Sequence, residues 1–187
     1  MSYLIKPLES YKAVRNCPKC GLKSNYINTN NFRINANGSL LDVWLIYQCE
    51  KCKSTLNIAI YERVKASLIN SEEYRKFLSN DEELSLEYGM NKSVFSKNRV
   101  EINLEALEYS IINIQEDNIN ENSIIIENPY EMKIRSHKII AEILNISRSK
   151  VNKLIKDKVI ILDKKYIGKR DEIIFTMPIS HIIDYKY

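Results

Sequence analysis

The feature that constrains this chain most is its set of four cysteines, which are all the cysteines it contains. They form two Cys-x-x-Cys pairs, Cys17 with Cys20 and Cys49 with Cys52, and 28 residues separate the pairs. A two-residue spacing lets one tight turn aim both sulfurs at one point, and two such turns supply the four thiolates that tetrahedral zinc prefers. The pattern predicts one structural metal ion held by all four cysteines. Zinc is the preferred ion, and iron remains the alternative.

The residues around the pairs predict the strands that carry them. Alternating apolar residues precede Asn37-Gly38, a dipeptide typical of hairpin turns, and residues 40–48 return as an aromatic and aliphatic strand. Residues 56–61 supply a third strand, whereas residues 1–16 are expected to be an irregular lead-in. Residues 1–65 are therefore predicted to form a three-stranded antiparallel zinc ribbon.

Trp44 is the only tryptophan of the chain and lies in the second predicted strand. On this strand Val43, Leu45 and Tyr47 should face one side, and Trp44 and Ile46 the other. We expect Trp44 to cap the small core of the ribbon. The alternative is an exposed ring on which a nucleic-acid base stacks.

Charge divides the chain into three parts. Residues 1–65, 66–131 and 132–187 carry net charges of +6, −9 and +7, so that two basic ends flank an acidic middle. Basic ends suit a polyanionic partner, although the same charges also serve only to solvate a small protein. Residues 66–99 are predicted to form an acidic helical connector. Its acidic residues lie at the starts of helices, where the helix dipole favours them. No histidine lies among them, so they do not indicate a catalytic carboxylate pair.

Residues 100–187 are predicted to form an α+β domain. Runs rich in β-branched residues at 107–115 and 123–127, around a polar turn at 116–122, indicate a hairpin. Ser136 then caps one helix and Ser147 a second, and two strands follow. The second helix is basic on its polar face, which indicates contact with phosphates. The predicted nucleic-acid-binding residues are Arg135, Ser147, Arg148, Lys150, Lys153 and Lys156.

Residues 132–177 resemble the α-L RNA-binding module named after ribosomal small-subunit protein four. The resemblance rests on Arg135 before the first helix, on Ser147-Arg148 at the start of the second, and on the hairpin after it. Lys158 stands where the module usually has Gly, and only Gly168 and Asp171 of its usual hairpin residues remain. The resemblance implies an interaction with structured RNA.

Residues 141–155 also resemble a helix-turn-helix, in which the helix from Ser147 would enter a DNA major groove. RNA is preferred because Arg135 fits the first module and a hairpin follows the helix at once. A third interpretation is a zinc-ribbon adaptor that docks another protein and has no catalytic activity.

Most of the chain resembles the uncharacterised bacterial family Domain of Unknown Function 1062. The residues that carry this resemblance are Cys17-Pro18-Lys19-Cys20-Gly21, Phe32-Arg33-Ile34-Asn35-Ala36-Asn37-Gly38, Leu41-Asp42-Val43-Trp44-Leu45-Ile46-Tyr47 and Ser147-Arg148-Ser149. The resemblance implies no activity.

The composition of the chain limits which other classes of protein it can belong to. Apolar residues make up 44% of the chain, no apolar run reaches the ~18 residues of a membrane span, and the N-terminus lacks signal-peptide features. We therefore expect a cytoplasmic protein without a membrane partner, and its many Asn, Ile and Lys residues suggest a bacterial source. Neither a Ser/His/Asp set nor a phosphate-binding glycine loop occurs, so no enzyme is expected. The predicted fold class is α+β, and the predicted function is zinc-stabilised binding of structured RNA, with DNA as the other nucleic-acid partner.

Overall fold

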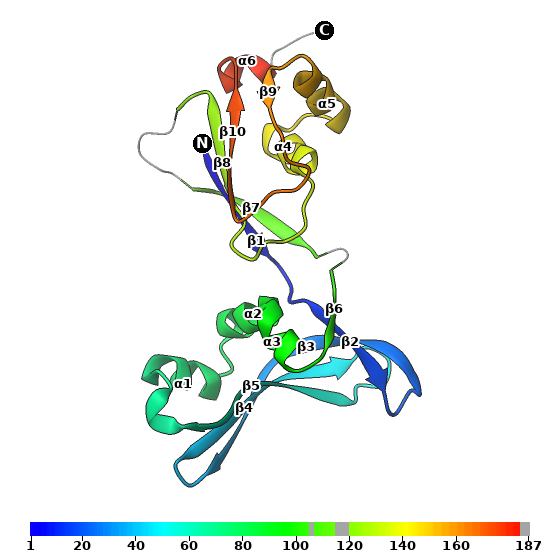
Figure 1. The fold of residues 1–187 in the computed structure, drawn as a ribbon, viewed down its shortest axis with the longest axis vertical. Coiled ribbons are helices and arrows are strands. Elements are labelled where there is room, and N and C mark those ends of the chain that lie inside the picture. The colour runs from blue at the N-terminus through cyan, green and yellow to red at the C-terminus, as the bar shows by residue number, and fades with distance from the viewer. Residues whose placement is uncertain (105–106, 115–119, 184–187) are drawn as a thin grey trace. The chain divides into compact units, whose positions relative to one another are not determined.

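The computed structural model describes residues 1–104, 107–114 and 120–183 (Figure 1). Their contacts divide the chain into two compact units. The central unit is Glu9–Leu107, and the terminal unit combines Met1–Leu8 with Glu108–Tyr187. Each unit is built around its own five-stranded sheet. None of the described helices combines the length and the apolar character needed to cross a bilayer.

The sheet of the central unit has the strand order β5-β4-β3-β2-β6, and every neighbouring pair is antiparallel. Its strands are β2 (Lys12–Cys17), β3 (Leu22–Asn37), β4 (Leu40–Cys49), β5 (Thr55–Lys65) and β6 (Glu101–Asn103). The expected hairpin between β3 and β4 is present, but its two loop residues are Gly38 and Ser39. Gly38 has a φ of +60° and Ser39 does not have a positive φ, which suits a turn with glycine in its first central position.

Three α-helices cover one face of this sheet. After the 3-10 turn η1 (Ala66–Leu68) come α1 (Ser71–Leu78), α2 (Glu82–Met90) and α3 (Lys92–Lys97). They begin where the side chains of Asn70, Asp81 and Asn91 accept hydrogen bonds from free backbone N–H groups. Phe77 of α1 meets Phe32 of β3 with ring centroids 4.9 Å apart, and Phe95 of α3 meets Tyr47 of β4 at 5.8 Å.

The sheet of the terminal unit has the order β7-β1-β8-β10-β9. Its strands are β1 (Ser2–Pro7), β7 (Tyr109–Ile114), β8 (Ser123–Glu127), β9 (Ile160–Ile161) and β10 (Arg170–Phe175), and its helices are α4 (Ser136–Leu144), α5 (Arg148–Lys156) and α6 (Ile179–Ile183). Strand β1 is antiparallel to β7 and parallel to β8. Buried Ile, Leu, Val and Phe side chains from the sheet and the helices form its core, among them Ile5, Ile126, Ile139, Leu154 and Phe175.

The fold predicted from the sequence is wrong in its parts. The sheet that carries the cysteines has five strands instead of three. Strand β2 lies in the expected lead-in, and β6, more than 80 residues further along the chain, pairs with it. The acidic middle is no separate connector, because the buried residues Phe77 of α1 and Phe95 of α3 pack on that sheet. The boundaries proposed at residues 65/66 and 99/100 fall inside the central unit.

The predicted α+β domain at residues 100–187 also differs from the structure, because a strand from elsewhere in the chain enters its sheet. Strands β7 and β8 do not pair with each other as the predicted hairpin requires, because β1 lies between them. Residues 116–119 of the turn predicted between them lie outside the described residues. The two helices and the antiparallel β9–β10 pair expected near the C-terminus are present. The two strands do not form a separate hairpin module, because β10 also pairs with β8 in the larger mixed sheet.

Candidate metal centre and basic helix

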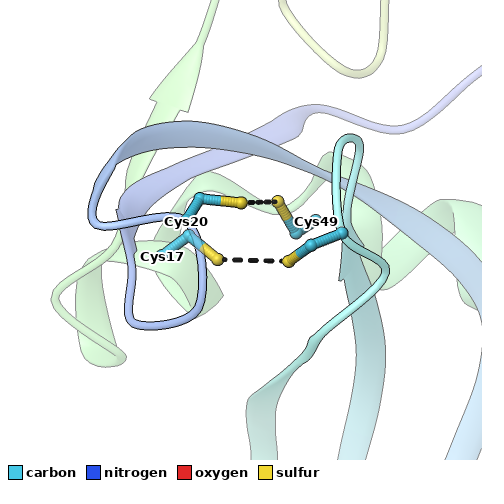
Figure 2. A group of neighbouring side chains, drawn as sticks. Cys17, Cys20 and Cys49 are labelled. Atoms are coloured by element: carbon cyan, nitrogen blue, oxygen red, sulfur yellow. Dashed lines mark hydrogen bonds between the residues drawn. The ribbon is translucent and has the colours of Figure 1, made fainter.

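Two tight turns at one end of the central sheet bring the four cysteines together (Figure 2). Cys17 ends β2 and Cys20 lies in the turn that leads to β3. Cys49 ends β4 and Cys52 lies in the turn that leads to β5. Because β3 pairs with both β2 and β4, the antiparallel ladder places the two turns side by side. Sheet pairing, and not sequence proximity, therefore joins the two Cys-x-x-Cys pairs.

The two turns have the same backbone geometry. The carbonyl of Cys17 accepts a hydrogen bond from the Gly21 N–H at 2.8 Å, and that of Cys49 accepts one from the Lys53 N–H at 3.0 Å. The fifth residue has a positive φ in both turns, +70° at Gly21 and +60° at Lys53. Glycine adopts this conformation without strain, whereas lysine does so at a cost in free energy.

The arrangement of the sulfurs fits a tetrahedral metal ion. All four Sγ atoms lie within 4.8 Å of one another, and the Cys17–Cys52 and Cys20–Cys49 pairs are separated by 3.5 and 3.9 Å. Bonds of about 2.3 Å from zinc to four sulfurs would place the sulfurs about 3.8 Å apart. The cluster can therefore hold a metal ion with little rearrangement. Cys17 and Cys49 are buried, and Cys20 and Cys52 are partly exposed.

Ser54 is the chief polar neighbour of the sulfurs. Its Oγ lies 3.2 Å from Cys17 Sγ and 3.1 Å from Cys52 Sγ. These hydrogen bonds lower the pKa of both thiols, and Tyr26 adds to the effect at Cys17. The pKa of Cys20 is raised, chiefly by its hydrogen bond with Cys52. Because a metal ion binds thiolates, the groups that stabilise the deprotonated form of Cys17 and Cys52 favour its binding.

Several lysines lie close to the cysteines along the chain. Lys12 pairs with Glu50 at 2.9 Å, and Lys23 pairs with Glu101 at 2.6 Å. Within the described part of the chain, the exposed side chains of Lys19 and Lys51 form no salt bridge. A four-thiolate zinc site carries a formal charge of −2, so these cations lower the electrostatic cost of assembling it.

The predicted nucleic-acid-binding residues lie in the terminal unit, and five of them belong to α5 or its cap. The Ser147 hydroxyl accepts a hydrogen bond from the Lys150 N–H at 3.1 Å and so begins the helix. Val151 and Leu154 are fully buried against the unit. Around the rest of the helix stand Arg148, Lys150, Lys153 and Lys156, of which Lys150 is half-buried and the others are exposed.

Arg135 is separated from that group by α4. It immediately precedes the helix, whereas Ser147 follows its end, and nine helical residues span about 13 Å. Arg135 pairs as an isolated bridge with Tyr166, whose ring has Lys133 Nζ at 5.3 Å and Lys165 Nζ at 5.6 Å from its centroid. The structure thus places a second basic group at the start of α4.

The two residues that carried the hairpin part of the α-L resemblance do meet. The carboxylate of Asp171 accepts a hydrogen bond from the Gly168 N–H at 2.7 Å and forms an ion pair with Lys164 at 2.5 Å. Asp171 is buried, so this loop is held by a charged group withdrawn from solvent. These contacts fix the loop that precedes β10 and leave the resemblance itself a prediction.

Sequence reasoning missed several residues at both sites. Ser54 follows Cys52 by two residues, and its position beside two sulfurs depends on how β5 begins. Tyr26 reaches the cluster only because it is the register partner of Cys49. Lys133, Lys165 and Tyr166 are joined by the pairing of residues 31 positions apart. No spacing along the chain distinguishes these side chains from ordinary surface residues.

Comparison with known proteins identifies a family. The model of the family described as Protein of unknown function (DUF1062) matches residues 34–166, which is more than half of the chain and includes the second cysteine pair and α5. Neither the curated proteins nor the solved structures include a match. The chain therefore belongs to the family Protein of unknown function (DUF1062).

Proposed function

We propose that this chain is a zinc-stabilised, non-catalytic protein that binds structured RNA through α5. The observation that carries the proposal is the exposed cationic surface of α5, which a folded helix presents on a rigid support. The metal centre contributes by holding the central sheet together. The functional and structural roles are thus assigned to different units of the chain.

The helical period supports one binding surface on α5. Val151 and Leu154 point into the unit, which turns Lys153 and Lys156 outward, and Arg148 and Lys150 lie on the two flanks of that outward face. No acidic residue lies in the first turn of the helix. Arg148 and Lys156 form no salt bridge within the described residues. Arg148 and Lys156 therefore offer their charge to phosphates instead of to acids of the same chain.

Zinc is proposed as the ion because four thiolates leave no open coordination position, as in structural zinc sites. This is also why we propose no metal-based catalysis. Elemental analysis of protein purified without added metal should give one zinc per chain. A visible thiolate-to-iron absorption band with stoichiometric iron would instead identify the alternative ion.

The test of α5 is a binding measurement with a hairpin RNA over a series of salt concentrations. Arg148→Gln with Lys156→Gln should weaken binding at least tenfold at low salt and reduce the salt slope by about two, because each phosphate contact releases about one counterion. The matched control is Lys6→Gln with Lys169→Gln, which removes the same charge from exposed positions of the same unit outside α5. Equal losses in both double variants would remove α5 from the proposal.

DNA binding is the second candidate, and the observation that favours it is the α4–turn–α5 geometry. Asn145 ends α4 with a left-handed φ of 52°, and only three residues separate the two helices. This matches the short connection of a helix-turn-helix. Adding duplex DNA to the complex of the chain with the RNA hairpin distinguishes the two candidates. If the chain is a DNA-binding regulator, duplex DNA at a concentration equal to that of the RNA should displace the RNA.

A further inference from the structure

Trp44 lies on the face of the central sheet that the helices leave open. Along β4 the buried residues Leu41, Val43, Leu45, Tyr47 and Cys49 alternate with the partly exposed residues Leu40, Asp42, Trp44, Ile46 and Gln48. The ring contacts of α1–α3 reach the sheet at Phe32, Tyr47 and Tyr61. Phe32 and Tyr61 are register partners of the buried residues Leu45 and Val43. The helices therefore cover the buried side of β4, and Trp44 faces away from them.

The neighbours of Trp44 on this open face are mostly polar. Its register partners are Arg33 of β3 and the buried Ala59 of β5, and Asn31 of β3 and Asn57 of β5 flank the next outward residue, Ile46. Arg33, Asn31 and Asn57 are exposed, whereas Trp44 and Ile46 are half-buried. We call these five residues the Trp44 face.

The groups on the Trp44 face are available to a ligand. Among the described residues, no aromatic or cation–π partner meets the Trp44 ring, and Arg33 forms no salt bridge. The acid nearest along the outward side of β4, Asp42, already accepts a hydrogen bond from the Arg63 N–H at 2.8 Å. The face thus combines an aromatic ring, a cation that forms no salt bridge within the described residues, and side-chain amides.

This combination matches an unpaired nucleotide. A base stacks on an aromatic ring, a guanidinium binds the adjacent phosphate, and amides pair with the donors and acceptors of base edges. A base pair inside a duplex does not expose its ring face, so the ligand has to be single-stranded. Two apolar side chains set among polar ones offer little area to an apolar protein partner.

We propose that the Trp44 face binds single-stranded RNA, with one base stacked on Trp44 and a neighbouring phosphate on Arg33. The inference goes beyond the proposed role of α5 and does not depend on it, because it rests on residues of the central unit alone. It gives the chain a site for unpaired bases in addition to the surface proposed for structured RNA.

The intrinsic fluorescence of the chain tests the proposal directly, because Trp44 is the only tryptophan. Titration of the metal-loaded full chain with a short oligouridine should quench this fluorescence saturably. Arg33→Gln should weaken the binding at least fivefold, whereas Arg99→Gln, which removes an exposed cation of the same unit outside the face, should not change it.

A labelled oligouridine followed by fluorescence anisotropy measures the variants that lack the reporter. Trp44→Ala should weaken binding about fivefold to a hundredfold, the range of one base stacked on an aromatic ring, and Trp44→Phe should weaken it less because a ring remains. Metal content and circular dichroism verify that each variant is folded. If Trp44→Ala fails to fold, Trp44→Phe and Arg33→Gln still decide the question.

The variant with Arg148→Gln and Lys156→Gln distinguishes the two proposals. Unchanged quenching by oligouridine in that variant supports the Trp44 face as an independent site, whatever its hairpin binding shows. Absence of quenching in the wild-type chain overturns the inference. Equal affinity for a DNA oligothymidine overturns the assignment to RNA, and an emission shift that depends on protein concentration, without any response to RNA, assigns the face to a second copy of the chain.

Discussion

In the central unit, three of the four strand pairings join strands that follow each other along the chain, and a cluster of four thiols closes one end of the sheet. In the terminal unit, β1 at the N-terminus lies between β7 and β8, more than 100 residues further along. The described residues of that unit include no comparable group of metal-ligating side chains. The comparison indicates that a bound metal ion can stabilise the sheet with mostly local connections, whereas the sheet that joins both ends of the chain depends on its buried core.

Metal removal should have the largest effect and should separate the two units. Four-thiolate zinc binding contributes about 10 kcal/mol or more to the folding of small zinc modules. Chelation, or Cys49→Ser, should therefore remove the hydrogen-exchange protection of β4 and β5 and leave β8 and β10 protected. Adding zinc back should restore the wild-type chain and not the variant. Simultaneous loss of protection in β8 and β10 would show that the metal stabilises both units.

A core substitution in β1 should give the converse result with a smaller effect. Ile5 has no exposed surface, and Ile5→Ala should lower the free energy of unfolding of the terminal unit by about 2–5 kcal/mol. In urea, the unfolding measured by circular dichroism should begin earlier, whereas the transition of Trp44 fluorescence, which reports on the central unit, should keep its midpoint.

Leu8→Ala is the control for this substitution, because Leu8 is 61% exposed and its loss should change neither transition. A shift of the Trp44 midpoint in Ile5→Ala would mean that the two units unfold as one and would contradict their independence. An unchanged zinc content in Ile5→Ala would show in addition that the metal site of the central unit does not depend on the core of the terminal unit.

The two cysteine turns offer the smallest and most symmetrical test. Relative to Lys53→Ala, which removes the same charge, Lys53→Gly should stabilise the central unit by up to about 1 kcal/mol, and Gly21→Ala should destabilise it by about the same amount relative to the wild-type chain, because only glycine adopts a positive φ without strain. No heavy atom lies within 4 Å of a Cβ built at Gly21, so that substitution acts through the backbone alone. Competition for zinc with a chelating dye measures the variants. Equal zinc affinities in Lys53→Gly and Lys53→Ala would mean that backbone strain does not control the turns.

Part of this fold follows from local sequence patterns. The Cys-x-x-Cys spacings, the hairpin at Gly38 and the capping of α5 by Ser147 each involve residues a few positions apart, and short-range geometry is enough to produce them. The alternation of buried and exposed residues on β4 likewise follows from the two-residue period of a strand. The sequence alone therefore indicated which four cysteines could hold a metal ion, that β3 and β4 form a hairpin and which helix carries the cations, whereas the strand β2 that ends in Cys17 was not expected.

The tertiary structure decided how distant segments pair. Residues 2–7 contain nothing that indicates a strand between β7 and β8, because their partners follow them by more than 100 positions. The residues of α1–α3 predict helices, but only packing determines that they cover one face of the central sheet and leave the Trp44 face open. Strand pairing and side-chain burial depend on the whole chain, and no local pattern of residues records which distant segment will complete a sheet.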